Sequence, residues 1–169
     1  MPYKLIARYS LNALAFGLVV GVLWLVVRLI CIRRPLDRRD GLWLATMVYL
    51  GMVLEIIGLR LGLQPIAPLT TVPRLQLMYT TVEQWHKGPG LFIYHVAGNI
   101  MWFVPVGFFL SRLFPGTRPI HALLTGLALS LLVETLQYLL GTGLPDIDDV
   151  LLNTLGAGLG GMIMARSRL

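Results

Sequence analysis

Five long apolar runs constrain this sequence more than any other feature. They cover residues 11–30, 41–62, 91–114, 119–140 and 148–165. A helix of about 20 mostly apolar residues is long enough to cross the hydrocarbon core of a bilayer, and such a helix satisfies its own backbone hydrogen bonds. The sequence therefore predicts an all-α fold, a polytopic membrane helix bundle of about five transmembrane helices.

Composition and charge agree with this class. Of the 169 residues, 56% are hydrophobic and 13% are charged, which is about half the charged fraction of a soluble domain. The net charge of +6 does not indicate nucleic acid, because the basic residues lie in short connections between the apolar runs. The single cysteine, Cys31, excludes a disulfide within this chain and a cysteine metal site. We expect a membrane-embedded protein with no nucleic-acid partner.

The distribution of Lys and Arg predicts the orientation in the cell membrane. Four basic residues fall on one side of the predicted bundle and eight on the other, and the richer side should be cytoplasmic. The N-terminus is then outside, the C-terminus is cytoplasmic, and "LPDIDD" (144–149) faces outward. The eight are Arg33, Arg34, Arg38, Arg39, Arg112, Arg118, Arg166 and Arg168, and the four are Lys4, Arg8, Arg74 and Lys87.

The runs divide a single membrane domain into two parts. Residues 1–90 form an N-terminal two-helix region with an extracytoplasmic loop, and residues 91–165 form a three-helix core. Within the loop, residues 74–86 carry Tyr79 and Trp85, which suit a position along the membrane interface.

Polar side chains recur at one depth of the predicted helices. Counted at 1.5 Å per residue from the outer ends, they fall in the outer third of the membrane on four helices. Two stripes follow helical spacing and are expected to face each other: one from Gly126 to Gly141, the other from Asp149 to Gly160. Gly156 and Gly160 should let a neighbouring backbone approach closely. The polar residues at this depth are Glu55, His95, Asn99, Ser130, Glu134, Gln137, Asp149 and Asn153.

Two interpretations of the acidic residues stay open. In the structural one, Asp146 is the N-cap of the last helix with Asp149 at the third helical position, and Glu134 is bonded to Gln137 and Asn153. In the functional one, each acidic residue within the membrane raises the free energy of insertion by about 2.5–3.5 kcal/mol unless it is paired or protonated, so caps and helix contacts alone do not account for all of these residues. The nearest basic residues, Arg60, Arg74 and Lys87, lie outside the acidic stretch. An acidic, amide-rich pocket suits a cation, an amine or a head group.

Three motifs in the last 75 residues or so resemble the VanZ-like family of small bacterial membrane proteins. They are "GNIMWFVPVGFFL" (98–110), "SLLVETLQ" (130–137) and "DIDDVLLNTLGAGLG" (146–160). An arginine commonly stands in the family where this chain has Gly143, and the upstream "PLTTVP" (68–73) is degenerate. The resemblance carries over to Asn99, Phe103, Pro105, Gly107, Glu134, Gln137, Asp146, Asp148, Asp149, Asn153 and Gly156.

The resemblance implies a protein of the cell envelope linked to resistance against lipoglycopeptide, teicoplanin-type antibiotics. We expect it to bind an outer-leaflet lipid or a lipid-linked cell-wall precursor without catalysis. One alternative is a membrane enzyme that acts on a lipid-linked substrate with Mg²⁺ or Ca²⁺ held by Asp146, Asp148 and Asp149. Another is a proton- or cation-coupled transporter that uses Glu55 and Glu134. The expected functional core is Asn99, Glu134, Gln137, Asp146, Asp148, Asp149 and Asn153, supported by Glu55, His95, Ser130, Pro105 and Gly156.

Overall fold

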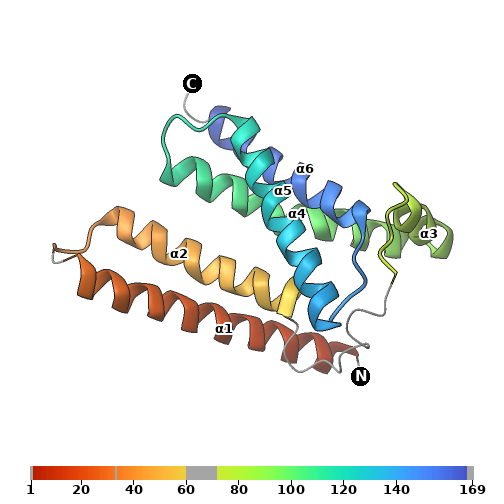
Figure 1. Cartoon of the computed structure of the whole chain (residues 1–169), viewed down its shortest axis with the longest axis horizontal. Coiled ribbons are helices and arrows are strands. Elements are labelled where there is room, and N and C mark those ends of the chain that lie inside the picture. The colour runs from red at the N-terminus through yellow and green to blue at the C-terminus, as the bar shows by residue number, and fades with distance from the viewer. Residues whose placement is uncertain (1, 33, 60–71, 167–169) are drawn as a thin grey trace. The chain divides into compact units, whose positions relative to one another are not determined.

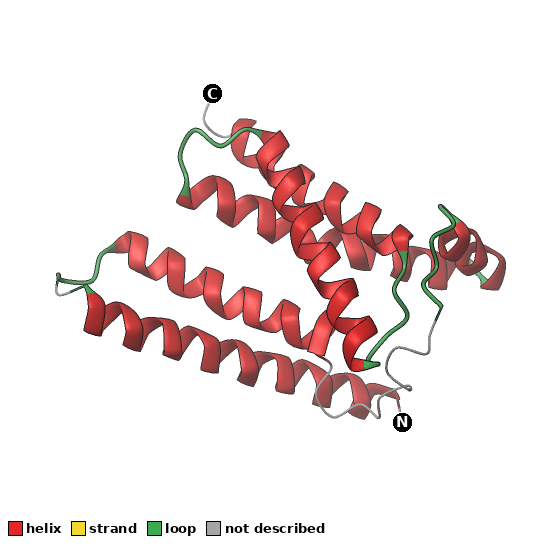
Figure 2. Cartoon of the chain, viewed as in Figure 1, coloured by secondary structure: helices red, strands yellow, loops and turns green. Residues whose placement is uncertain are grey.

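The computed structural model describes residues 2–32, 34–59 and 72–166, and within them every regular element is a helix (Figures 1 and 2). The predicted all-α fold is confirmed. The helices are α1 (Pro2–Cys31), α2 (Arg38–Val53), the π-helix η1 (Leu54–Leu59), α3 (Tyr79–Lys87), α4 (Pro89–Leu113), α5 (Pro119–Leu140) and α6 (Ile147–Arg166). They belong to two compact units, Met1–Gln64 and Pro65–Leu169.

The number of membrane-spanning helices differs from the predicted five. Among the described residues, three segments are long and apolar enough to cross a membrane: Ser10–Cys31, Pro89–Leu113 and Pro119–Leu140. Residues 60–62 of the run at 41–62 lie outside the described residues; in the rest of the run, α2 has 16 residues and passes into the π-helix η1 at Leu54, so neither helix is long enough. The run at 148–165 falls short because Asp148, Asp149 and Asn153 lower the hydropathy of α6.

The first unit is a hairpin in which α1 and α2 lie side by side (Figure 1). Close approach depends on glycine, because a Cβ on Gly51 would come within 2.8 Å of the Cα of Gly17. Asp37 begins α2 by accepting hydrogen bonds from the N–H groups of Arg39 and Asp40, at 2.8 and 2.9 Å. Asp40 completes a capping box by accepting from the N–H of Asp37 at 3.0 Å.

In the second unit α6 packs between α4 and α5. A Cβ on Gly156 or Gly160 would meet the carbonyls of Ile100 and Val104, and one on Gly107 would meet that of Ala157. The predicted close backbone approach at Gly156 and Gly160 is confirmed. The backbone that approaches Gly156 and Gly160 is that of α4. The prediction that these two glycines face the stripe on α5 is therefore wrong.

Prolines and one glycine mark where these helices begin and end. Pro89 and Pro119 occupy the first turns of α4 and α5, where the missing N–H costs nothing. Gly141 ends α5 in the left-handed conformation, at φ 64°. Pro105 lies inside α4, which nevertheless continues to Leu113. The turn after Gly141 therefore returns the chain directly to the start of α6.

Candidate functional site

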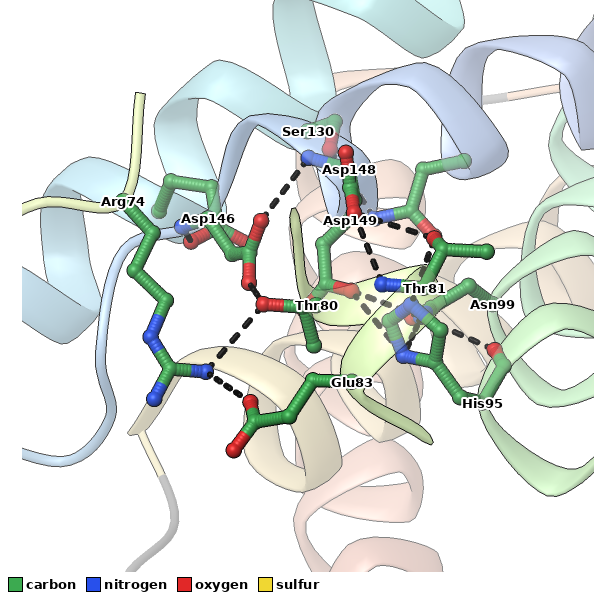
Figure 3. A network of polar contacts seen from close by, with 12 residues as sticks. Arg74, Thr80, Thr81, Glu83, His95, Asn99, Ser130, Asp146, Asp148 and Asp149 are labelled. Atoms are coloured by element: carbon green, nitrogen blue, oxygen red, sulfur yellow. Dashed lines mark hydrogen bonds and ion pairs between the residues drawn. The ribbon is translucent and has the colours of Figure 1, made fainter. Parts of the chain in front are cut away.

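Asp146 forms the centre of a buried polar network where α6 begins (Figure 3). Its side chain accepts from the N–H of Asp148 at 2.9 Å, which makes it the N-cap that the sequence predicts. The N–H of Asp146 donates to Glu134 Oε2 at 2.9 Å, so Glu134 fills the role that a capping box would give to Asp149. The hydroxyl of Thr80 donates to the second oxygen of Asp146. One aspartate thus links α3, α5 and α6.

Asp148 caps the beginning of α3. It accepts from the N–H of Met78 at 2.5 Å, and from the N–H and the hydroxyl of Thr81 at 2.9 and 3.0 Å. Met78 is the N-cap of α3, has a positive φ of 62° and makes no side-chain capping bond. The carboxylate of α6 therefore supplies the acceptor that the start of α3 lacks, and it does so while 1% exposed.

The segment that precedes α3 is fastened to the same place. The N–H of Arg74 donates to the carbonyl of Pro145 at 2.8 Å, and the N–H of Ile147 donates to the carbonyl of Arg74 at 3.0 Å. The guanidinium of Arg74 donates to Thr80 at 3.1 Å and to Glu83 at 3.3 Å. Arg74 is thus a counter-charge to the network, although it precedes the acids by 70 residues or so in the sequence.

Glu83 lies between two basic side chains on the surface of α3. Lys87 donates to its second oxygen at 2.8 Å. The hydrogen bond from Lys87, with the charges of Lys87 and Arg74, holds the pKa of Glu83 below its usual value. Glu83 is therefore ionised at neutral pH.

A second cluster joins α4 to α6 beside the first (Figure 3). The amide of Asn99 donates to Asp149 Oδ1 at 2.8 Å and to the carbonyl of His95 at 3.0 Å. Nδ1 of His95 lies 3.6 Å from the same Asp149 oxygen, and its Nε2 lies 3.3 Å from the hydroxyl of Thr81. The Asp149 side chain is 27% exposed. Asp149 is therefore within reach of a ligand, whereas Asp146 and Asp148 are enclosed.

One turn further along α6, Asn153 donates to the hydroxyl of Ser130 on α5 at 2.9 Å. Both side chains are fully buried, and Asn153 Oδ1 has no hydrogen-bond partner in the described part of the chain. Gln137 is also buried, beneath the turn that contains Gly143. A Cβ on Gly143 would lie 2.5 Å from Gln137 Oε1, so any larger side chain at this position requires Gln137 to move.

The structure brings most of the predicted residues together in one connected network, in which each aspartate has different principal partners. Asp146 is bonded to Glu134 and Thr80, Asp148 to α3, and Asp149 to α4. Within residues 2–32, 34–59 and 72–166, no three His, Cys, Asp or Glu side chains are grouped so that they could hold a metal ion. Glu55 lies in the first unit, in η1, and Arg60 lies outside the described residues.

Sequence reasoning did not identify Thr80 and Thr81, which supply the hydroxyl donors of the network. The sequence does carry a local signal, because adjacent threonines stand at the start of a short amphipathic segment and threonine hydroxyls often form hydrogen bonds where helices begin. The signal does not reveal the acceptor, since the aspartates that bind these threonines are 66 or more residues away.

The model of the VanZ/LLP1 family matches residues 43–168. This range includes the whole polar network and all of α3 to α6. Neither the curated proteins nor the solved structures give a significant match to the chain.

Proposed function

Because the chain belongs to the VanZ/LLP1 family and has helices long and apolar enough to cross a membrane, we propose that it binds a lipid head group in the cell envelope. The ligand is an outer-leaflet lipid or a lipid-linked cell-wall precursor. Binding takes place where α3 is fastened to α6, and no bond of the ligand is broken.

The observation that carries the proposal is the contrast between the two faces of the α3 segment. Its inner face is held by buried aspartates, while Leu77, Tyr79, Val82 and Trp85 stay exposed on its outer face. Tyrosine and tryptophan favour the boundary between lipid and water, and apolar residues beside them favour acyl chains. A cavity of about 400 Å³ opens on this segment, lined by residues 76–79, 82, 83 and 86. The segment therefore offers a lipid both a polar and an apolar surface.

Asp149 is the group best placed to recognise the head group. It is the partly exposed acid of the α6 turn, and the Asn99 amide and the His95 ring hold its carboxylate in one orientation. A carboxylate accepts hydrogen bonds from amines and hydroxyls, which are the donors that phosphoethanolamine and sugar head groups present. We expect the ligand to donate to Asp149.

Two neighbouring substitutions test this assignment in a deletion strain that carries the gene on a plasmid. Asp149→Asn should abolish protection against a teicoplanin-type antibiotic while membrane abundance on quantitative blots stays near wild type. Asp148→Asn is the comparison, because it removes the same charge from the same helix but acts by releasing α3. Its loss of protection should come with faster hydrogen exchange in residues 79–87, which Asp149→Asn should leave at the wild-type rate.

Three results would contradict the proposal. Full protection by Asp149→Asn at normal abundance would remove Asp149 from the site. A changed pool of lipid-linked precursors in the deletion strain would favour the enzyme instead. Unchanged antibiotic sensitivity in that strain would refute the link to lipoglycopeptides.

The proposed orientation has a direct test. In a Cys31→Ser background, a cysteine at Gln76 should react with an impermeant thiol reagent added to intact cells, whereas one at Arg38 should react only after lysis. Both positions are exposed in the structure, so a failure to react reports the side of the membrane. The reverse pattern would place the α3 segment in the cytoplasm.

The second candidate function is a proton- or cation-coupled transporter, and the observation that favours it is the environment of Glu55. Its side chain is 3% exposed, and Oε2 has no hydrogen-bond partner among the described residues. It lies in a π-helix, a distortion that is often found at functional sites. Proton uptake by the protein in liposomes that disappears in Glu55→Gln would favour transport over binding.

A further inference from the structure

The cavity on the α3 segment combines one acid, one tyrosine ring and an apolar wall. Its volume of about 400 Å³ falls within the range of about 300–1,000 Å³ that small-molecule sites usually have. Tyr79, Val82, Glu83 and His86 of α3 line it at the spacing of a single helix face, and the rest of the lining is residues 76–78. One helix face and the loop that precedes it thus form this lining.

The buried network beneath α3 holds this helix face in place. Thr80 donates to Asp146, Thr81 donates to Asp148, and all four side chains are buried. The residues that line the cavity are therefore carried by a helix whose inner side is fixed to α6. In such a preformed cavity, a ligand loses little affinity to the ordering of protein side chains.

The charges around the cavity select a neutral ligand. Glu83 is the acid of the lining, and Arg74 bonds to it at 3.3 Å without lining the cavity (Figure 3). Lys87 bonds to the other carboxylate oxygen at 2.8 Å, and this hydrogen bond lowers the pKa of Glu83, so the acceptor is ionised. A phosphate would meet the carboxylate, and an amine would meet two basic side chains, so both ions are repelled. A neutral ligand with hydroxyl donors meets neither obstacle.

Tyr79 supplies a flat apolar surface beside this acceptor. The guanidinium of Arg74 lies 5.5 Å from the centre of the ring and covers one face in a cation–π contact. Tyr79 is nevertheless 46% exposed and lines the cavity, so part of its ring is open to a ligand. The C–H face of a sugar ring stacks on such an aromatic surface, while its hydroxyl groups extend to polar neighbours. Gln76 and His86, both exposed, add an amide and an imidazole to the lining.

A lipid can bring this sugar to the cavity. Leu77 and Val82 are exposed members of the lining, and Trp85, which adjoins the lining in the sequence, is exposed too. These side chains suit contact with acyl chains and with the membrane interface. We propose, as a refinement that rests on the proposed function, that the cavity binds the neutral sugar of a lipid-linked head group. The sugar stacks on Tyr79 and donates its hydroxyl groups to Glu83.

Saturation-transfer NMR on the full chain, in nanodiscs of deuterated lipid, tests this assignment. Methyl glucoside and N-acetylglucosamine are the probes. Each should receive magnetisation from saturated aromatic protons of the protein, most strongly at the C–H groups on one face of the sugar ring. Ethanolamine and glycerol phosphate at the same concentration should receive none, because each carries a charge that the cavity repels. No transfer to both sugars, or equal transfer to either ion, would overturn the proposal.

Variants of the lining locate the sugar. Tyr79→Leu should weaken binding of methyl glucoside about tenfold through lost stacking, whereas Tyr79→Phe keeps the ring and should bind as wild type. Glu83→Gln should weaken binding about tenfold, because a charged acceptor becomes a neutral one. Trp85→Leu is the matched control, since it removes an exposed aromatic ring of the same helix that does not line the cavity. Equal losses in Tyr79→Leu and Trp85→Leu, each with an unchanged Tm, would refute the site.

Two comparisons identify the source of the sugar and separate this site from the proposed function. A glucosyl diacylglycerol in the nanodisc should displace methyl glucoside, and a failure to displace it would overturn the assignment to a lipid-linked sugar. If Asp149→Asn abolishes antibiotic protection but neither sugar binds, the proposed function stands and the sugar site is refuted. If the sugars bind while Asp149→Asn protects fully, the sugar site stands and the role of Asp149 in the proposed function is refuted.

Discussion

Replacing Asp148 by asparagine should release α3 from α6 while the long helices stay folded. The carboxylate accepts three hydrogen bonds, from the N–H of Met78 and from the N–H and hydroxyl of Thr81. Asparagine keeps one acceptor oxygen and points its NH₂ at a backbone donor. At least one buried N–H then loses its partner, which costs about 1–3 kcal/mol, and the charge at the start of α3 is also lost.

A loss of about 2 kcal/mol corresponds to a factor of about 30 in the opening equilibrium of α3. Hydrogen exchange measured by mass spectrometry on the protein in nanodiscs reports this directly. Amides of residues 79–87 should exchange about 30-fold faster, while those in the middle of α4, α5 and α6 should be unchanged. The magnitude applies to local opening because α3 has nine residues and its fastening depends on few contacts.

Asp149→Asn is the control for this experiment. It removes the same charge one residue along α6, where the carboxylate is held by Asn99 and His95 of α4. Exchange in residues 79–87 should then stay at the wild-type rate. Unchanged exchange of α3 in Asp148→Asn, or an equal increase in both variants, would refute the assignment of Asp148 as the cap of α3.

Two further predictions concern packing and pH. Gly107→Ala places a methyl group against the backbone of α6 and should lower stability by about 1–3 kcal/mol, seen as a lower Tm in detergent, whereas Gly98→Ala has nothing within 4 Å and should change little. The pKa of Asp40 is lowered from 3.8 to about 2 by Arg28, so the pair stabilises the fold fully above about pH 4 and loses this effect as the pH falls through about 2. The difference in Tm between wild type and Asp40→Asn should therefore shrink from about pH 4 to about pH 2, and a constant difference would contradict the linkage.

The sequence by itself determined the features that depend on local chemistry. Apolar runs long enough for a bilayer gave the helical class, and α5 begins and ends at the predicted residues 119 and 140, between Pro119 and the left-handed Gly141. The N-cap role of Asp146 followed from its place before α6, and the glycine spacing at 156 and 160 predicted a close backbone contact. These properties need only a few neighbouring residues, so they can be predicted without a fold.

Tertiary structure decided what each of the three aspartates does. Successive residues of a helix point about 100° apart, so adjacent acids at 148 and 149 face different neighbours. Asp148 meets α3, 70 residues earlier in the chain, and Asp149 meets Asn99 of α4. No periodicity encodes which helix lies on each side, because that choice depends on packing across the whole unit. The sequence therefore showed that the acids gather at one end of α6, and only the fold showed that two of them are enclosed while Asp149 stays within reach of a ligand.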